Sequence, residues 1–284
     1  MSKKSVVALG LPESGKTTFL AALWHLITNL KVKVRLSLVK LAAGEAAYLR
    51  AIAARWAQAK KQDRTFQSGN KTVTLTLKPA DGEEFDLTFP DIAGEAFSQM
   101  WEMRECTPAV AEALHATGVL LFIHVDKIKA PGWIADDAAL SQGMGVAQGG
   151  EPAPWKPESA PTQVQLVDIL RCLQEPPLDV GPRKLAVILS AWDKVEADEV
   201  SPARFLEMHL PLLYQYLVHG LGAGWEMRIF GVSAQGADYD GVEGTPTADA
   251  DRMREMEIPS QRIKVVVGNA TTHDLTDPVH WLLG

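Results

Sequence analysis

The feature that most constrains the fold is a glycine-rich turn near the start of the chain. Residues 10–17 read G-L-P-E-S-G-K-T and match the phosphate-loop pattern G-x-x-x-x-G-K-[ST] without a mismatch. Gly10 and Gly15 permit backbone angles and close approaches that a Cβ forbids. Such a turn points successive N–H groups at a phosphate, and the following helix aims its positive end at the same anion. The pattern therefore predicts a strand, a phosphate-binding turn and a helix.

The flanking sequence and the side chains of the turn fit this prediction. Residues 6–9 are an apolar run typical of a buried strand, and residues 17–30 carry apolar side chains at helical spacing. Lys16 can reach the β- and γ-phosphates, and the Thr17 hydroxyl can ligate Mg²⁺. We therefore expect a nucleoside triphosphate to be bound by Gly10, Glu13, Ser14, Gly15, Lys16, Thr17 and Thr18.

Strand and helix patterns alternate along the chain, which predicts an α/β fold with a mostly parallel central sheet and helices on both faces. Apolar and polar residues alternate on both sides of the turn at 79–82, which predicts a hairpin and hence one antiparallel strand. The expected strands are 4–9, 31–39, 72–77, 85–89, 119–125, 184–190, 227–232 and 263–267. The expected helices are 16–29, 42–61, 95–117, 162–174, 202–218 and 278–283.

We predict a single domain over residues 1–284 with three additions. The span between the first helix and the hairpin, about 31–70, is far longer than a minimal connection and carries its own helical pattern. Residues 127–161 are rich in proline and glycine and predict a long insertion. Residues 236–259 form a polar, acidic segment that predicts a second loop.

Composition and charge exclude several classes of protein. The formal net charge is −7 without a basic stripe, so we expect no nucleic-acid partner. Cys106 and Cys172 are far apart and have no metal-site spacing, which favours a reducing compartment. The first predicted strand starts close to the initial Met, and no apolar run approaches the roughly 18 residues that span a bilayer. We therefore expect a cytoplasmic protein without a membrane segment.

A second motif follows the predicted hairpin. Residues 91–94 read D-I-A-G, a D-x-x-G element between an apolar strand and a helix. There Asp91 can hold Mg²⁺ through water, and the N–H of Gly94 can sense the γ-phosphate, so that hydrolysis releases the loop. A threonine before the hairpin would be a further Mg²⁺ ligand; Thr65 and Thr72 are candidates, and we prefer Thr65.

Two further motifs follow apolar strands and predict a base-recognition site. Residues 190–193 read S-A-W-D, and Asp193 can accept hydrogen bonds from the N1 and N2 hydrogens of guanine. Residues 232–235 read V-S-A-Q, and their backbone N–H groups can meet the guanine O6. The predicted contacts are Ser190, Trp192, Asp193, Ser233, Ala234 and Gln235.

In this order the motifs resemble those of Ras-like GTPases of the translation-factor-related (TRAFAC) P-loop class, over about residues 4–283. Within that class the chain is most similar to the bacterial "double-GTPase" proteins, which share a P-x-S-G-K-T-T-F-L-type loop and a D-P-x-x-W-L-L-type tail, here residues 277–283. The resemblance implies a Mg²⁺-dependent switch that binds GTP and GDP in a bacterial signalling or conflict system, with a protein effector or activating partner.

The chain departs from the pattern of the class at three places. The base motif is S-A-W-D rather than N-K-x-D, so Ala191 lacks the lysine stem that packs over the base, and we interpret Trp192 as supplying part of that stacking. Glu95 replaces the glutamine that orients the attacking water, and Pro12 replaces a glycine that leaves room for a partner's arginine. We therefore predict slow hydrolysis with Lys16, Thr65, Gly94 and Glu95 as catalytic residues.

Two alternatives stay open at this stage. An ATPase of the same fold is compatible with the divergent S-A-W-D motif. A nucleotide-binding interaction module with negligible turnover is compatible with Glu95 and Pro12. The sequence also leaves open whether two copies of the chain form a dimer across their nucleotide sites.

Overall fold

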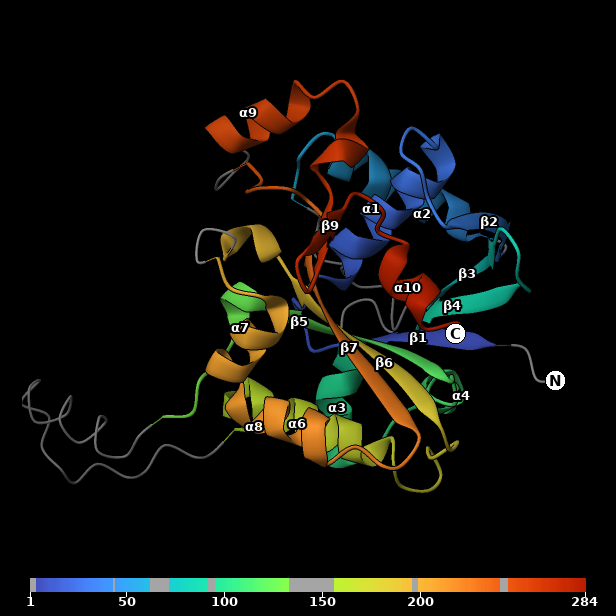
Figure 1. Cartoon of the computed structure of the whole chain (residues 1–284), viewed down its shortest axis with the longest axis vertical. Helices are drawn as coiled ribbons and strands as arrows, with labels where there is room; N and C mark the ends of the chain where they lie inside the picture. Colours follow the sequence, from blue (N-terminus) through green and yellow to red (C-terminus); the bar gives the residue numbers. More distant parts are fainter. Residues whose placement is uncertain are drawn as a thin grey trace, which may run out of the picture.

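The computed structural model describes residues 4–42, 44–61, 72–90, 95–132, 156–195, 199–240 and 245–284. Within these ranges the chain forms a nine-stranded sheet in the order β2-β3-β4-β1-β5-β6-β7-β8-β9 (Figure 1). The strands are β1 (Ser5–Leu9), β2 (Leu36–Leu41), β3 (Val73–Pro79), β4 (Phe85–Phe89), β5 (Gly118–His124), β6 (Arg183–Ser190), β7 (Trp225–Ser233), β8 (Lys264–Val267) and β9 (Ala270–Thr272).

The centre of the sheet is parallel. Strands β4, β1, β5, β6 and β7 run in one direction, and their carboxyl ends meet at one edge. β3 pairs antiparallel with both β2 and β4, and β8 pairs antiparallel with both β7 and β9. The mostly parallel α/β sheet expected from the sequence is confirmed. Two strands, β3 and β8, run against the others where the sequence predicted one.

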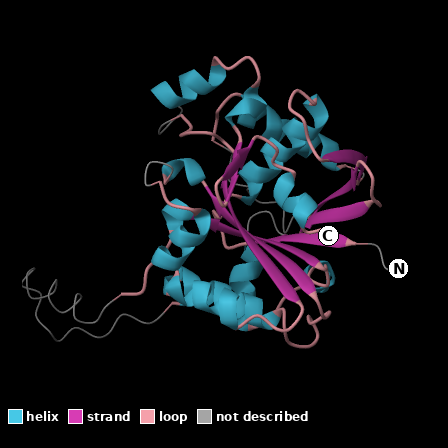
Figure 2. Ribbon diagram, in the orientation of Figure 1, coloured by secondary structure: helices cyan, strands magenta, loops and turns pink. Residues whose placement is uncertain are grey.

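Helices cover both faces of the sheet (Figure 2). One face packs against α1, α2 and α10, and the other against α3, α4, α6, α7 and α8. The helices are α1 (Lys16–Asn29), α2 (Glu45–Ala57), α3 (Glu95–Met103), α4 (Pro108–Ala113), α6 (Thr162–Cys172), α7 (Pro202–His209), α8 (Pro211–His219), α9 (Ala248–Arg254) and α10 (Asp277–Trp281).

The alternation of side chains along the central strands explains this layering. In β1, Val6 and Ala8 enter the core beneath α1, whereas Val7 and Leu9 enter the core beneath α3 and α6. Successive side chains of a strand point to opposite faces, so a strand covered on both sides must be apolar throughout. Because helices cover the central strands on both faces, these strands coincide with the uninterrupted apolar runs of the sequence.

Two predicted helices are broken in the structure. The predicted helix 95–117 is divided into α3 and α4 at Arg104, whose φ of 61° lies outside the helical range. Thr107 then caps α4 by accepting a hydrogen bond from the N–H of Val110. The predicted helix 202–218 is divided into α7 and α8 before Pro211, which has no N–H to continue the helical ladder. The predicted N-cap Ser201 accepts the N–H of Arg204.

The segment after α1 forms β2 at the edge of the sheet and then α2, which packs on α1. Part of the predicted acidic loop 236–259 forms the short helix α9, whose first turn is capped by Thr247. Its sequence, A-D-A-D-R-M-R, is too short and too polar to give a helical apolar pattern. Residues 133–155 of the predicted insertion lie outside the described residues.

Helix α8 offers a matched test of the core. Leu213 is fully buried and its neighbour Leu212 is 53% exposed. We predict that Leu213→Ala lowers the free energy of unfolding by about 2–5 kcal/mol, because it leaves a cavity under the sheet. Leu212→Ala should change it by less than about 0.5 kcal/mol. Denaturant unfolding of both variants measures the difference; equal losses would contradict the packing of α8.

Candidate nucleotide-binding site

The predicted motifs meet at the carboxyl edge of the parallel strands. The phosphate turn follows β1, S-A-W-D begins at the last residue of β6, and S-A-Q begins at the last residue of β7. Open parallel sheets bind ligands in the crevice outside these strand ends. The hydroxyl of Ser190 donates to the carbonyl of Ser14 over 2.8 Å, and so joins the base motif to the phosphate turn.

The two glycines of the turn are required by their surroundings. A Cβ on Gly15 would lie 2.7 Å from the Ser190 Oγ, and Gly15 is the N-cap of α1 with a φ of 94°. A Cβ on Gly10 would lie 2.5 Å from the Ser14 Oγ and 2.9 Å from the Phe122 carbonyl. Both glycines are thus required by the close packing of the turn on β5 and β6, and the positive φ angles that they allow fit a phosphate-binding turn.

Lys16 places a cation inside this turn. Its side chain is 2% exposed, and its ammonium donates to the carbonyls of Gly10 at 2.6 Å and Leu11 at 3.0 Å and to the hydroxyl of Ser14 at 3.2 Å. The ring of Phe97 in α3 lies 6.0 Å from the same nitrogen. The helix that follows the D-x-x-G element therefore lies next to the phosphate turn.

The first turn of α1 carries the two threonines of the motif. Thr17 and Thr18 are half-buried and follow Lys16 directly. The Thr18 hydroxyl lies 2.9 Å from the phenolic oxygen of Tyr239, a residue that follows β7. Thr17 remains the predicted Mg²⁺ ligand of this turn. Glu13 is held in a left-handed conformation with a φ of 59°.

The two base motifs contact one another. The carboxylate of Asp193 accepts a hydrogen bond from the Ser233 hydroxyl at 2.5 Å, and the same oxygen of Ser233 accepts the N–H of Gly236 at 3.1 Å. Lys194 forms an ion pair of 2.5 Å with Asp238. The carboxylate of Asp193, the predicted base-reading residue, is therefore oriented by the last residue of β7.

Trp192 corrects one expectation. The indole is 3% exposed, packs edge-to-face on Phe205 with ring centroids 5.6 Å apart, and covers Gly231, where a Cβ would lie 2.5 Å from the ring. The ring is a core side chain of the face that carries α7 and α8. We therefore assign it no stacking role on a base.

The S-A-Q residues point mainly toward the protein. The carbonyl of Ala234 accepts the Trp56 indole N–H at 2.9 Å, and the side-chain nitrogen of Gln235 approaches the sulfur of Met253 at 3.9 Å. The S-A-Q segment is thus attached to α2 through Trp56 and to α9 through Met253. Its backbone N–H groups, rather than the Gln235 side chain, remain the predicted contacts for a base.

Three predicted residues, Thr65, Asp91 and Gly94, lie outside the described residues. Glu95 is the exposed first residue of α3. Thr72, the alternative to Thr65, donates its hydroxyl hydrogen to the Pro90 carbonyl at 2.9 Å. Thr72 therefore bridges the start of β3 to the residue before the D-x-x-G element.

Three titratable groups near the site have shifted pKa values. Burial lowers the pKa of His124, which ends β5, although the carboxylates of Asp126, Asp193 and Glu13 act in the opposite direction. Burial raises the pKa of Tyr239 to about 12 and lowers that of Arg262 to about 10. Near pH 7 the phenol is therefore protonated and the guanidinium charged. The sequence did not indicate Tyr239 or Lys194, because their partners, Thr18 and Asp238, are distant from them in the chain.

The Double-GTPase 1 family model matches residues 7–282, which span every motif of the site. The chain belongs to the Double-GTPase 1 family. The resemblance to double-GTPase proteins is thereby confirmed, and membership supports a GTPase that binds guanine nucleotides. No functionally curated protein matches the sequence significantly. Among the described residues, no helix is both long enough and apolar enough to cross a bilayer.

Several solved structures are similar to this family member at low identity. The S. cerevisiae Ski7 GTPase-like domain bound to GTP has 13% identity and a TM-score of 0.44 over 87% of this chain and 46% of that one. The mammalian SRP receptor has 12% identity and a TM-score of 0.38 over 83% and 94%. This chain therefore spans about half the length of the Ski7 structures it matches.

The packing of Trp192 on Gly231 predicts a steric coupling. Gly231→Ala should lower the free energy of unfolding by about 1–3 kcal/mol, because the new methyl group meets the indole. In a Trp192→Leu background the same change should cost less, because most ring atoms are gone. Denaturant unfolding of the two single variants and the double variant measures the coupling. An equal cost in both backgrounds would contradict the buried position of the ring.

Proposed function

We propose that this protein is a Mg²⁺-dependent GTP-binding protein that hydrolyses GTP slowly to GDP and phosphate and acts as a molecular switch in bacterial signalling or conflict. One observation carries the proposal. The phosphate turn and both base motifs form one connected site, through Ser190 to Ser14 and through Asp193 to Ser233.

The phosphate end supports triphosphate binding. Lys16 and the N-terminal N–H groups of α1 supply positive charge to the β- and γ-phosphates. Thr17 would hold Mg²⁺ together with Thr65 and Asp91. When bound, Mg²⁺ neutralises charge on the phosphate oxygens. Gly94 would sense the γ-phosphate, and a protein effector would respond to the resulting state of the loop.

The base end supports guanine recognition. Guanine presents two N–H donors, at N1 and N2, on the edge that a single carboxylate can accept, whereas adenine has an acceptor at N1 and no amino group at C2. Asp193 is held by the Ser233 hydroxyl, so its carboxylate is oriented before the base arrives. Ala191 provides no stem over the base, so the preference for guanine over adenine rests on Asp193 and the S-A-Q backbone.

The catalytic residues support a slow reaction. Catalysis would rest on positioning and on charge stabilisation by Lys16, without a covalent enzyme intermediate. Glu95, exposed at the start of α3, would orient the attacking water, but its carboxylate also places negative charge near the γ-phosphate. We propose turnover on the order of 10⁻² s⁻¹ or less without a partner.

Calorimetric titration of GTP, GDP and ATP with Mg²⁺ into nucleotide-free protein tests the proposal. We predict that guanine nucleotides bind far more tightly than ATP, and that Asp193→Asn reduces this preference about 100-fold. That loss corresponds to two hydrogen bonds to a charged acceptor, about 3 kcal/mol. The Asp193→Asn variant should bind xanthosine triphosphate better than GTP, because xanthine carries an oxygen at C2 that the new amide can donate to.

Lys16→Ala is the matched control for the phosphate end. It should weaken GTP and ATP alike and leave their ratio unchanged, because it removes a phosphate contact and no base contact. Equal binding of ATP and GTP by the unaltered protein would favour an ATPase. Tight GTP binding without phosphate release, measured over hours, would favour an interaction module.

A further inference from the structure

The segment after the S-A-Q motif returns to the phosphate end of the site. Ser233 contacts Asp193 at the base end, and six residues later the hydroxyl of Tyr239 lies 2.9 Å from the Thr18 hydroxyl in the first turn of α1. Tyr239 is half-buried. One short stretch of chain therefore connects both ends of the proposed nucleotide site.

Both neighbours of Tyr239 are fixed by ion pairs. Asp238 accepts from the Lys194 ammonium at 2.5 Å, and Lys194 directly follows the base-reading Asp193. Asp240 accepts from the Arg254 guanidinium of α9 at 2.5 Å, and its side chain is 11% exposed. The Tyr239 carbonyl also accepts the Thr247 hydroxyl at 3.2 Å. The backbone on either side of the ring is thus fixed relative to the base motif and to α9.

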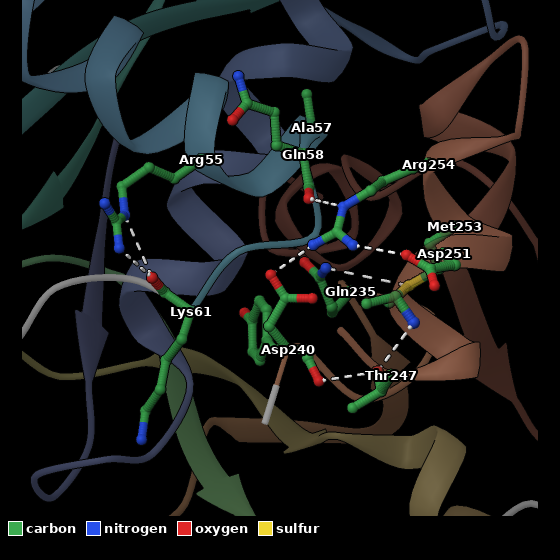
Figure 3. Close-up of polar contacts among 12 residues, drawn as sticks. Arg55, Ala57, Gln58, Lys61, Gln235, Asp240, Thr247, Asp251, Met253 and Arg254 are labelled. Carbon is green, nitrogen blue, oxygen red and sulfur yellow. Dashed lines mark hydrogen bonds and ion pairs between the residues drawn. The ribbon is translucent and has the colours of Figure 1, made fainter. Parts of the chain in front are cut away.

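Figure 3 shows that Arg254 contacts the end of α2 as well as the neighbour of Tyr239. The guanidinium lies between Asp240, Asp251 and the carbonyl of Gln58 that follows α2, at 2.5, 2.8 and 2.9 Å. Beneath this segment, Arg262 stacks on the Trp56 ring at 4.0 Å and donates to the Trp56 carbonyl. Arg254 thereby attaches the Tyr239 segment to the residue after α2, and Arg262 contacts the last turn of the same helix.

Tyr239 joins the first turn of α1 to the segment that contacts the base motif. A nucleotide bound with its base at Asp193 and its β- and γ-phosphates at Lys16 places its ribose and α-phosphate between them. We propose that Tyr239 is a nucleotide-positioning residue, whose ring forms the wall beside the ribose and α-phosphate and whose hydroxyl holds Thr18 in place. This inference rests on the proposed function and adds a residue that lies outside the recognised motifs.

The proposal has a specific consequence for the two nucleotides. The ribose and α-phosphate are common to GTP and GDP, so Tyr239 stabilises both complexes equally. It sets how long a nucleotide stays bound, and it does not distinguish the two states of the switch. A residue that sensed the γ-phosphate would instead affect GTP alone.

The test uses Tyr239→Phe, which removes only the hydroxyl, and Tyr239→Ala, which also removes the ring. Tyr214→Phe, on α8 at the other face of the sheet, is the control for the same chemical change. The readouts are the dissociation constants of GTP, GDP and ATP, the dissociation rate of fluorescent GDP, and the thermal midpoint without nucleotide. Guanine-nucleotide binding by the unaltered protein is measured first.

We expect Tyr239→Phe to weaken GTP and GDP equally, by up to about 5-fold, because Thr18 loses the hydrogen bond that holds it in place. Tyr239→Ala should weaken both by about 30-fold or more, mainly through faster dissociation. The nucleotide-free thermal midpoint of Tyr239→Phe should fall by no more than about 2–4 °C, the shift expected from one lost hydrogen bond. Tyr214→Phe should leave every binding constant unchanged. The double variant with Thr18→Val and Tyr239→Phe should bind nucleotide as tightly as the single variant that binds it less tightly, because both substitutions remove the same hydrogen bond.

Three results would overturn the inference. Unchanged affinities in Tyr239→Ala would show that the ring lies away from the nucleotide. Tighter binding by Tyr239→Phe would show that the hydroxyl competes with the ligand for Thr18. Weakening of GTP alone would place the residue at the γ-phosphate. Failure of the unaltered protein to bind any guanine nucleotide is a separate result, and it would overturn the proposed function together with this inference.

Discussion

The hydrogen bond from the Ser190 hydroxyl to the Ser14 carbonyl holds the site together. It is buried, and it connects the end of β6 to the turn after β1, two strands that lie on either side of β5. The bond requires Gly15, because a Cβ there would lie only 2.7 Å from the Ser190 oxygen and displace it. Ser190 and Gly15, which are distant in the chain, are therefore matched to each other in size. Their contact fixes the neighbouring residues Lys16 and Asp193 relative to one another.

The parts of the structure that follow from local sequence could be predicted. A strand, a glycine-rich turn and a helix form within about 25 neighbouring residues, and the apolar runs of the central strands identify a sheet covered on both faces. That the two base motifs lie close together also followed, because the carboxyl ends of neighbouring parallel strands meet at one edge; the hydrogen bond between Asp193 and Ser233 did not.

The remaining features depend on contacts between distant residues or on side chains without a pattern. Trp192 is buried because Gly231 on the next strand leaves room for its ring, and nothing near Trp192 in the sequence indicates that space. Tyr239 reaches Thr18 because ion pairs fix its neighbours to Lys194 and Arg254. Helix α9 is short and polar, and its stability comes from its cap and from its contact with the residues after α2.

The attachment of α2 to the base loop has a thermodynamic consequence. The Trp56 indole donates to the Ala234 carbonyl, and Arg254 joins the Gln58 carbonyl to Asp240, so displacing α2 also breaks bonds made by the loop that would hold the base. Equilibria that share such bonds are reciprocally linked. A macromolecule that bound a displaced α2 would lower the affinity for nucleotide by some factor, and nucleotide would weaken that macromolecule's binding by the same factor.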